Sequence, residues 1–339
     1  MITADSLDSA IRGCWPTIAP GERVPRRLAY ILLTKGVEEG SKLVLLVFLD
    51  GNAAPRLAVK LGRTPAQNAS LEAERRNLEA LADRGDNGQV GAPVVLGSSW
   101  IDGRLILMQL PVEGRNLLEL AAASRSTMYV RLVVDWLIHL ARATRHVAAE
   151  KALSDRRLAG PEAPEPGRLL RDLPRESLPS PLSILNELRG ESIPAVFEQR
   201  DLSTWNILVG ADGRLTVLDW ESASPAGIPV WDLFYFLLQY GFMVHRAAGP
   251  QAQLRSFSDT FATRTGFGAI AHEAVARYIG AVGVRREWLS PLLAACWAHH
   301  AYGEASRRRV RASDTLFGQL VEATLRLEQE GRLEWPRAA

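Results

Sequence analysis

The pattern of apolar residues in this chain changes once, at Pro111, and this change constrains the fold more than any other feature. Before Pro111, short apolar runs alternate with turn residues, which is typical of strands. The sequence predicts such strands at 30–34, 42–49, 56–61, 93–96 and 104–110. After Pro111, apolar residues recur mostly at helical spacing. We therefore predict an α+β chain in which a small antiparallel β-rich lobe is followed by a larger, mainly helical lobe.

The predicted division of the chain follows from the same pattern. Its 339 residues are roughly twice the ~150 of a typical domain, so two lobes are expected. Residues 1–27 are predicted to be a lead-in with a short helix, residues 28–110 the β-rich lobe, and residues 111–339 the helical lobe. The proline-rich stretch 154–194 is predicted to be a surface insertion in the helical lobe. One helix, at 70–84, is expected inside the β-rich lobe.

Charge and cysteine content narrow the class of protein. The 40 Lys and Arg and the 38 Asp and Glu leave a formal net charge of +2, which gives no reason to expect a nucleic-acid partner. No apolar run approaches the ~20 residues of a membrane span. The two cysteines, Cys14 and Cys296, lie far apart in sequence, which is typical of a reducing compartment. Since the N-terminus also lacks an apolar signal segment, we expect a cytoplasmic protein.

One polar constellation interrupts the helical half of the chain and points to phosphoryl transfer. Asp201 is followed five residues later by Asn206, and Asp219 comes 13 residues after Asn206, at the end of a short apolar run. Phosphoryl transfer needs a group that orients the attacking hydroxyl and divalent ions that neutralise charge. Mg²⁺ prefers oxygen ligands, of which the protein usually supplies one or two. Asn206 and Asp219 can supply those oxygens, and Asp201 can face the acceptor hydroxyl.

These residues resemble the catalytic segment of the aminoglycoside phosphotransferase and choline kinase-like family, small-molecule kinases that share the protein-kinase fold. The family pattern is His-Gly-Asp, four residues, Asn, and later an Asp-Trp or Asp-Phe pair, to which Asp219-Trp220 corresponds. The sequence departs from this pattern at Gln199, which stands where the family has His. A Gln amide can also donate a hydrogen bond. The resemblance covers roughly residues 28–330 and implies a bilobal protein-kinase-like fold.

The resemblance also implies roles for residues of the β-rich lobe. Lys60, one of only four lysines among the 40 Lys and Arg, matches the lysine that contacts the α- and β-phosphates of ATP. An ammonium group on a flexible stem suits that contact. Glu74 resembles the glutamate that pairs with this lysine, with Glu72 as a rival for the role. Gln109 and Leu110 resemble the hinge between the lobes, whose backbone would bind adenine.

By the same resemblance, the chain is an ATP- and Mg²⁺-dependent phosphotransferase that moves the γ-phosphoryl group to a hydroxyl of a small molecule. Asp201 is the predicted catalytic residue, Asn206 and Asp219 are the predicted magnesium ligands, and Asp232 is a predicted brace for the catalytic loop. A sugar, a nucleoside, an aminoglycoside or a related metabolite fits as acceptor. The ten acidic residues and thirteen arginines from Ser222 onward do not favour a polycationic acceptor.

Two other functions remain open at this point. A pseudokinase, meaning a nucleotide-binding scaffold without turnover, is favoured by Gln199 and by Glu38-Glu39 in the loop between the first two strands. That loop has no G-x-G-x-x-G pattern. A protein kinase is disfavoured, because only about twelve residues separate Asp219 from Trp231. The sequence leaves the oligomeric state undetermined.

Several of these residues also have a purely structural interpretation. Lys60 can be a surface lysine at a strand end. The three tryptophans near the motif, Trp205, Trp220 and Trp231, can be core residues rather than a substrate platform. The adjacent histidines 299 and 300 have no Glu or Cys at ligand spacing, so a metal site is not expected there.

Overall fold

The structure is a computed structural model that describes residues 3–33, 42–83, 90–120, 125–144, 178–185, 188, 191 and 193–337. Its contacts divide the chain into two compact units. Unit 1 comprises Met1–Arg115 and Leu208–Ala223, and unit 2 comprises Asn116–Ile207 and Ser224–Ala339. Asp219 therefore belongs to unit 1, together with Lys60, although its segment follows the catalytic motif in sequence.

Unit 1 is built on a five-stranded antiparallel sheet with the order β1-β2-β3-β5-β4. Its strands are β1 (Leu28–Leu32), β2 (Leu43–Leu49), β3 (Leu57–Leu61), β4 (Val95–Ile101) and β5 (Arg104–Gln109). The five predicted strands are thus confirmed. β4 extends beyond its predicted end because Ser98 and Ser99, which carry no apolar signal, continue the pairing with Leu107 and Ile106 of β5.

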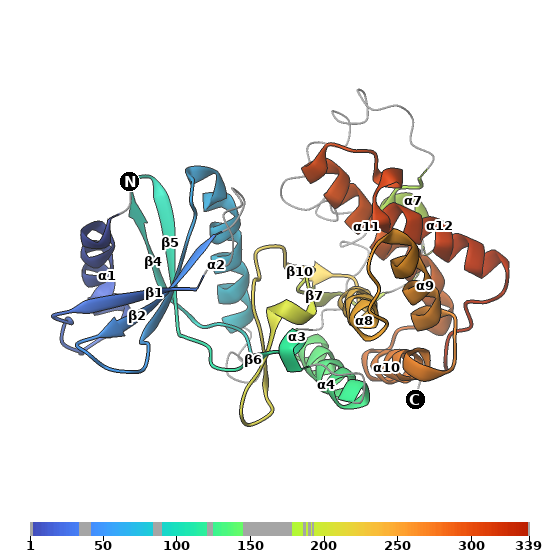
Figure 1. Ribbon diagram of the computed structural model, residues 1–339, viewed down its shortest axis with the longest axis horizontal. Coiled ribbons are helices and arrows are strands. Elements are labelled where there is room, and N and C mark those ends of the chain that lie inside the picture. Colours follow the sequence, from blue (N-terminus) through green and yellow to red (C-terminus); the bar gives the residue numbers. More distant parts are fainter. Residues whose placement is uncertain are drawn as a thin grey trace. The chain divides into compact units, whose positions relative to one another are not determined.

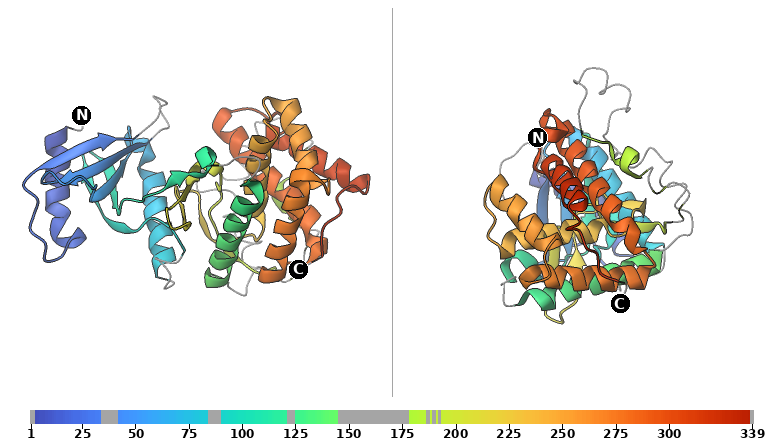
Figure 2. Two further views of the ribbon diagram at one scale, coloured as in Figure 1. Left: turned by 60° about the horizontal axis from the view of Figure 1, so that its bottom comes forward. Right: turned by 90° about the vertical axis from the view of Figure 1, so that its right-hand side faces the viewer.

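Strand alternation gives this sheet two different faces. On one face, Val47 and Val59 are fully buried in a core that also contains Ile11 and Trp15 of α1 (Ala4–Ile18). α1 and α2 (Asn68–Ala82) lie on opposite sides of the sheet (Figures 1 and 2). The helix expected within the lead-in 1–27 is therefore part of the core of unit 1.

α2 confirms the helix predicted at 70–84, and it packs on the face opposite to α1 through the buried Leu71. Leu71 contacts Leu105 and Leu107 of β5 in a separate small cluster. The fully buried Glu74 lies on the same helix, less than one turn after Leu71. This packing fixes a carboxylate against the sheet face on which Lys60 lies.

Unit 2 is mainly helical, as predicted for the chain after Pro111. Its helices are α3 (Leu117–Leu120), α4 (Ser126–Thr144), α7 (Pro181–Leu185), α8 (Trp231–Val244), α9 (Pro250–Phe261), α10 (Gly266–Val282), α11 (Leu289–Arg308) and α12 (Leu316–Gln329). α8 is the most buried of them and packs against α4, α9, α10 and α11. A two-stranded sheet of β7 (Val196–Glu198) and β10 (Ser224–Gly227) leads into the motif at Asp201.

Two short strands follow the motif at Asp201. β8 (Ile207–Val209) and β9 (Leu215–Val217) are members of a three-stranded sheet with β6 (Arg115–Asn116), in the order β6-β8-β9. β8 starts directly after Asn206, and β9 ends two residues before Asp219. The pairing of β9 in this sheet therefore fixes the position of the chain two residues before Asp219.

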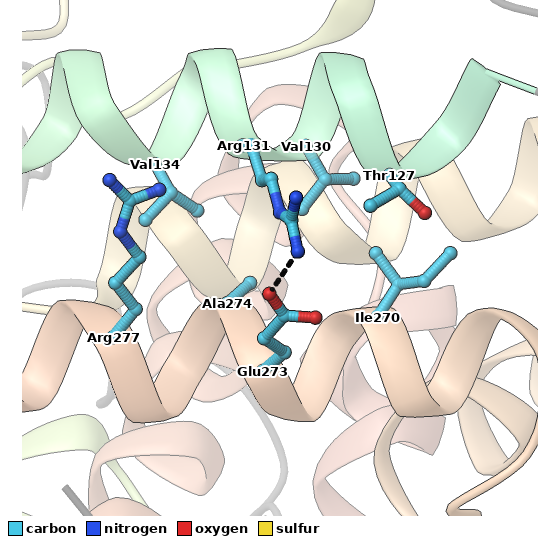
Figure 3. Close-up of a pocket in the computed structure, with 8 residues that line it drawn as sticks. All are labelled: Thr127, Val130, Arg131, Val134, Ile270, Glu273, Ala274 and Arg277. Atoms are coloured by element: carbon cyan, nitrogen blue, oxygen red, sulfur yellow. Dashed lines mark hydrogen bonds and ion pairs between the residues drawn. The ribbon is translucent and has the colours of Figure 1, made fainter. Parts of the chain in front are cut away.

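A shallow groove runs between α4 and α10 (Figure 3). Apolar residues of both helices line it, and the ion pair between Arg131 and Glu273, 2.7 Å apart, crosses it. The groove contains none of the predicted site residues. We interpret it as the seam along which two amphipathic helices pack.

Some predicted features fall outside the described residues. These are the loop 34–41 with Glu38 and Glu39, and most of the predicted insertion 154–194, of which α7 is the described helical part. Within the described ranges, every helix falls short of the length and apolar character that a membrane span requires.

Candidate active site

Unit 1 brings Lys60 and Glu74 together in a buried ion pair. Lys60 Nζ lies 2.6 Å from Glu74 Oε1, and the Glu74 side chain is fully buried. Burial lowers the pKa of Lys60, but the charges of Glu74 and Asp219 outweigh it, so the pKa is raised. The rival Glu72 instead pairs with Arg75 on the same helix, at 2.5 Å. The structure therefore assigns the pairing role to Glu74 and makes Lys60 an inward-facing lysine.

Gln109 contributes its side chain to this pair. Its Nε2 donates to Glu74 Oε1 at 3.3 Å, and the residue is 3% exposed. The sequence points only to the backbone of Gln109 and Leu110, as a hinge that binds adenine. The Leu110 N–H donates to the Val94 carbonyl at 2.9 Å, so an adenine contact that leaves this bond intact must use the Leu110 carbonyl oxygen.

Asp219 is positioned by backbone contacts to α2 and to the segment before β4. Asn77 of α2 donates to the Trp220 carbonyl at 2.8 Å, and the Val217 N–H donates to the Gly91 carbonyl at 2.8 Å. Gly91 has φ +64, and a Cβ there would lie 2.0 Å from the Leu215 carbonyl oxygen, so only glycine fits. Asp219 itself has φ 62, a left-handed conformation that Asp tolerates better than most residues.

A second lysine reaches the same carboxylate. Lys42 Nζ and Lys60 Nζ each lie 3.8 Å from Asp219 Oδ1, and Lys42 also forms an ion pair with Glu221. Burial lowers the pKa of Lys42, while the charges of Asp219 and Glu74 oppose that shift. Lys42 was not among the predicted site residues. The signal that points to it in the sequence is that lysine is rare in this chain, which has only four.

The sheet face that carries Lys60 also presents apolar residues. Val44 is the cross-strand partner of Lys60, and Leu46 is the partner of both Ala58 and Ile31, so these side chains share one face. Ile31 is 52% exposed, and the other three apolar residues are partly buried. An apolar surface beside a buried, ion-paired lysine is chemically suited to the planar ring of a nucleotide base.

Unit 2 holds Asp201 and Asn206 in one hydrogen-bonded loop. Asn206 Nδ2 donates to Asp201 Oδ2 and to the Asp201 carbonyl oxygen, each at 2.9 Å. Tyr235 of α8 donates to Asp201 Oδ1 at 3.3 Å. Both carboxylate oxygens of Asp201 are therefore oriented. Because the Asn206 amide nitrogen is used in this way, its side-chain oxygen Oδ1 is the atom that can bind a cation.

Gln199 and Asp232 hold the same loop through hydrogen bonds to its backbone N–H groups. Asp232 Oδ2 accepts from the Gln199 N–H at 2.7 Å, and Asp232 Oδ1 accepts from the Arg200 N–H at 2.8 Å. The bracing role predicted for Asp232 is confirmed by these bonds. Gln199 Oε1 accepts a hydrogen bond from the Asp201 N–H at 2.8 Å, so the Gln199 side chain holds the backbone of Asp201.

Arg200 completes a buried charged cluster with Glu198 and Asp232. Arg200 Nε lies 3.2 Å from Glu198 Oε2, and all three residues are less than 10% exposed. Burial raises the pKa of Glu198, and burial together with the Glu198 charge raises the pKa of Asp232 to about 7. Arg200 has φ 69, a conformation that costs a branched or long side chain more than glycine. The sequence did not predict this cluster. Glu198 and Arg200 resemble ordinary loop charges, and Asp232 lies more than thirty residues later in the chain.

Aromatic residues stack beside Tyr235. His300 of α11 lies 4.5 Å from the Tyr235 ring, and Phe317 of α12 lies 5.0 Å from the His300 ring. Burial and the positive charge of Arg307 lower the pKa of His300 to about 3, so this histidine is neutral. Trp220 and Trp231 are buried core residues, whereas Trp205 is 51% exposed.

Asp219 of unit 1 and Asn206 of unit 2 each offer an oxygen atom of the kind that magnesium prefers. Asp219 offers a carboxylate on a side chain that is 37% exposed, and Asn206 offers an amide oxygen whose partner nitrogen is already bonded. In the described part of the chain, no three His, Cys, Asp or Glu residues gather into a metal-binding group. Mg²⁺ is commonly held by one or two protein oxygens together with phosphates and water, so a larger cluster is not needed.

Two solved structures illustrate the similarity of this fold to known proteins. A thermostable mutant of aminoglycoside phosphotransferase APH(4)-Ia, solved as a ternary complex with ADP and hygromycin B, is 11% identical, with a TM-score of 0.51 over 88% of this chain and 93% of that chain. Choline kinase LicA from Streptococcus pneumoniae is 13% identical, with a TM-score of 0.46 over 93% of this chain and 98% of that chain. No curated protein matches this chain in sequence.

The match to a family model and the fold together define the class of this protein as a phosphotransferase with a protein-kinase-like fold. The chain belongs to the phosphotransferase enzyme family, whose model matches residues 44–277, more than half of its length. The predicted family is thus confirmed, and so is the prediction of a small-molecule kinase with an alcohol group as acceptor.

Proposed function

We propose that this protein is an ATP- and Mg²⁺-dependent kinase that transfers the γ-phosphoryl group to a hydroxyl of a small molecule. The observation that carries the proposal is the position of Lys60 Nζ, 2.6 Å from the buried Glu74 and 3.8 Å from Asp219. A buried lysine held by a buried carboxylate next to a second, more exposed carboxylate is the arrangement that a triphosphate with its cation needs.

The nucleotide contacts come from the β-rich lobe, residues 28–110. Lys60 neutralises the α- and β-phosphates, and Glu74 fixes the direction of its ammonium group. The apolar face with Val44, Leu46 and Ala58 contacts the base, and the Leu110 carbonyl oxygen accepts from its amino group. The side chain of Gln109 acts through Glu74, while its backbone remains part of the proposed adenine-binding hinge.

Asp201 orients the acceptor hydroxyl and takes its proton as the new phosphate ester forms. Asn206 and Tyr235 hold both oxygens of its carboxylate, so the carboxylate does not have to reorganise during the reaction. Asn206 and Asp219 would hold Mg²⁺, which when bound neutralises charge on the phosphates. Gln199 keeps the Asp201 backbone in place, which weakens the reason for a scaffold without turnover.

The acceptor is proposed to be a neutral or anionic alcohol, such as a sugar, a nucleoside or a related metabolite. Tyr235 contacts Asp201, His300 stacks on the Tyr235 ring, and the charge of Arg307 acts on both of these aromatic residues. His300 is neutral and offers stacking surface. An aminoglycoside would bring several ammonium groups toward Arg307, and like charges repel. No nucleic-acid partner is proposed, and a cytoplasmic location remains our expectation.

The test is nucleotide binding and turnover in wild type, Asp219→Asn and Asp201→Asn. Mg²⁺·ATP at 100 times its dissociation constant should stabilise the wild type by about 2.7 kcal/mol, with the effect much reduced in Asp219→Asn. ADP release should then be screened against neutral, anionic and polycationic alcohols. If the wild type gains no stability at saturating Mg²⁺·ATP, the proposal fails. If it binds ATP but phosphorylates no acceptor class, the scaffold interpretation is supported instead.

A further inference from the structure

Lys42 directly precedes β2, on the same side of the sheet as Lys60. In the register of β2 and β3, Leu43 is opposite Leu61 and Val44 is opposite Lys60. Because side chains alternate along a strand, Lys42 and Val44 point to the face that Lys60 occupies. The Lys42 and Lys60 side chains are each 13% exposed. Two of the chain's four lysines therefore share one face of unit 1.

The two lysines differ in their partners. Lys60 is committed to Glu74 at 2.6 Å, and Gln109 supports the same carboxylate. Lys42 pairs with Glu221, which stands on the loop after β9, two residues beyond Asp219. Both ammonium groups lie 3.8 Å from one oxygen, Asp219 Oδ1. Lys42 is thus beside the same proposed cation ligand as Lys60, but its own partner comes from a loop rather than from a buried helix.

A purely structural role explains this arrangement poorly. Ion pairs at a protein surface contribute little to stability, and enclosing a lysine costs free energy that the carboxylates of Glu221 and Asp219 repay only in part. In a chain that uses arginine for 36 of its 40 basic residues, a lysine is also the weaker choice for a fixed two-pronged ion pair with a carboxylate. A compact ammonium on a flexible stem is better suited to a partner that arrives and leaves.

The sequence before Lys42 shows why a second cation is needed. Kinase folds often cradle the phosphates with the backbone N–H groups of a G-x-G-x-x-G loop. The segment between the first two strands has no such pattern and contains Glu38 and Glu39. A triphosphate bound without that cradle requires positive charge from side chains. Lys42 follows these two glutamates, three residues after Glu39.

We propose that Lys42 is a second phosphate-binding lysine of the nucleotide site, and that Glu221 holds its ammonium group beside Asp219 until a nucleoside triphosphate replaces Glu221 as its partner. This proposal rests on the proposed ATP-dependent function. It predicts that the contribution of Lys42 to affinity grows with the number of phosphates on the nucleotide, because the lysine touches phosphate and not the base.

The first experiment measures the dissociation constants of ATP, ADP and adenosine for wild type, Lys42→Met and Lys60→Met. Lys42→Met should weaken ATP by about ten- to a hundredfold, ADP less, and adenosine less than twofold, as expected for the loss of a charge-assisted contact. Lys42→Arg should recover part of the ATP affinity. The matched control is Arg56→Met, which removes an exposed ion pair with Glu22 in the same unit and should leave all three constants unchanged.

The outcomes separate the two proposals. If Lys60→Met loses ATP affinity while Lys42→Met binds all three nucleotides like the wild type, the role of Lys42 is refuted and the kinase function stands. If Lys42→Met loses ATP and adenosine equally, Lys42 has only a structural role and the inference is again refuted. If the wild type binds no nucleotide, the proposed function itself fails.

A second experiment needs no variant and so is independent of whether Lys42→Met folds. An acyl phosphate of ATP transfers its acyl group to an amine near the phosphates: the lysine nitrogen attacks the acyl carbon, an amide forms, and ATP leaves. Mass spectrometry of the wild type should find label on both Lys42 and Lys60, and excess ATP, but not adenosine, should prevent it. Label on Lys60 without label on Lys42 would overturn the inference.

Discussion

The side-chain amide of Gln109 donates a hydrogen bond to the buried carboxylate of Glu74, 3.3 Å away. The accepting oxygen, Glu74 Oε1, is the one that also receives the Lys60 ammonium group. Gln109, the last residue of β5, thereby fixes the rotamer of the Glu74 carboxylate on α2, and this carboxylate in turn orients the ammonium group of Lys60. A kinase that depends on the direction of Lys60 must depend on Gln109 as well.

Replacing Gln109 with Leu should therefore raise the KM for ATP about fivefold, which corresponds to the loss of one hydrogen bond of about 1 kcal/mol. The measurement is steady-state kinetics at varied ATP with the preferred acceptor. Glu72→Gln is the control, because Glu72 pairs with Arg75 on the outer side of the helix and should not affect ATP. An unchanged KM in Gln109→Leu would show that Glu74 holds its position without this bond.

Asp201→Asn should lower kcat by a factor of about 10²–10⁴, the usual contribution of a positioned general base, while the dissociation constant for ATP changes less than twofold. Tyr235→Phe removes only one hydrogen bond to Asp201, so its kcat should fall less than about tenfold. Rapid-quench measurement of phosphoryl transfer separates this step from product release. Equal losses in the two variants would contradict the assignment of Asp201 as the group that accepts the proton.

Arg200→Gly tests which of two opposing effects is larger. Glycine relieves a left-handed backbone that costs a non-glycine residue about 1–2 kcal/mol. The change also removes the partner of the buried Glu198, and breaking a buried ion pair costs about 3–5 kcal/mol. We therefore expect a net loss of about 2 kcal/mol in the free energy of unfolding, measured by urea denaturation.

The double variant Glu198→Gln/Arg200→Gly provides the check on this reasoning. A neutral amide at position 198 can still accept from the Ile228 N–H and leaves no buried charge without a partner. The double variant should then be more stable than Arg200→Gly alone. If the double variant is less stable, the cost of Arg200→Gly does not come from leaving the buried charge of Glu198 without a partner.

Acid should destabilise the protein through His272. Burial and the charge of Arg264 lower its pKa to about 4, from a value near 6.5 in the unfolded chain. The unfolded state thus binds more protons between these values, so stability is fully present above pH 6.5 and is lost as the pH falls toward 4. A shift of this size corresponds to about 3 kcal/mol.

The measurement is the free energy of unfolding at several pH values in wild type and His272→Gln. Gln can keep the hydrogen bond that His272 Nε2 makes to the Phe261 carbonyl, 3.1 Å away, but it does not titrate. The variant should lose less stability than the wild type between pH 6.5 and 4. Parallel pH profiles would mean that His272 does not contribute to the acid sensitivity.

Local pattern was sufficient for much of the candidate site. Asp201, Asn206 and Asp219 are marked by their spacing, and Lys60 by its place at the end of a strand. Glu74 and Glu72 could not be separated in this way, because both lie on one short stretch of helix. The packing of Leu71 on β5 decides between them, since it turns Glu74 toward the sheet and leaves Glu72 to Arg75.

Sequence alone determined the order of the β-rich and helical parts and the motif that names the chemistry, because strand alternation, helical period and residue spacing are properties of neighbouring residues. The tertiary structure alone decided that Lys42, Lys60 and Asp219 meet and that the side chain of Gln109 supports Glu74. These contacts join residues that are from 35 to well over a hundred positions apart, and the contacts of Lys60 and Gln109 depend on strand register. The spacing of apolar residues predicts which face of a strand or helix is buried. Which charged residues then meet at that face depends on strand register and on the packing of elements that are distant in sequence.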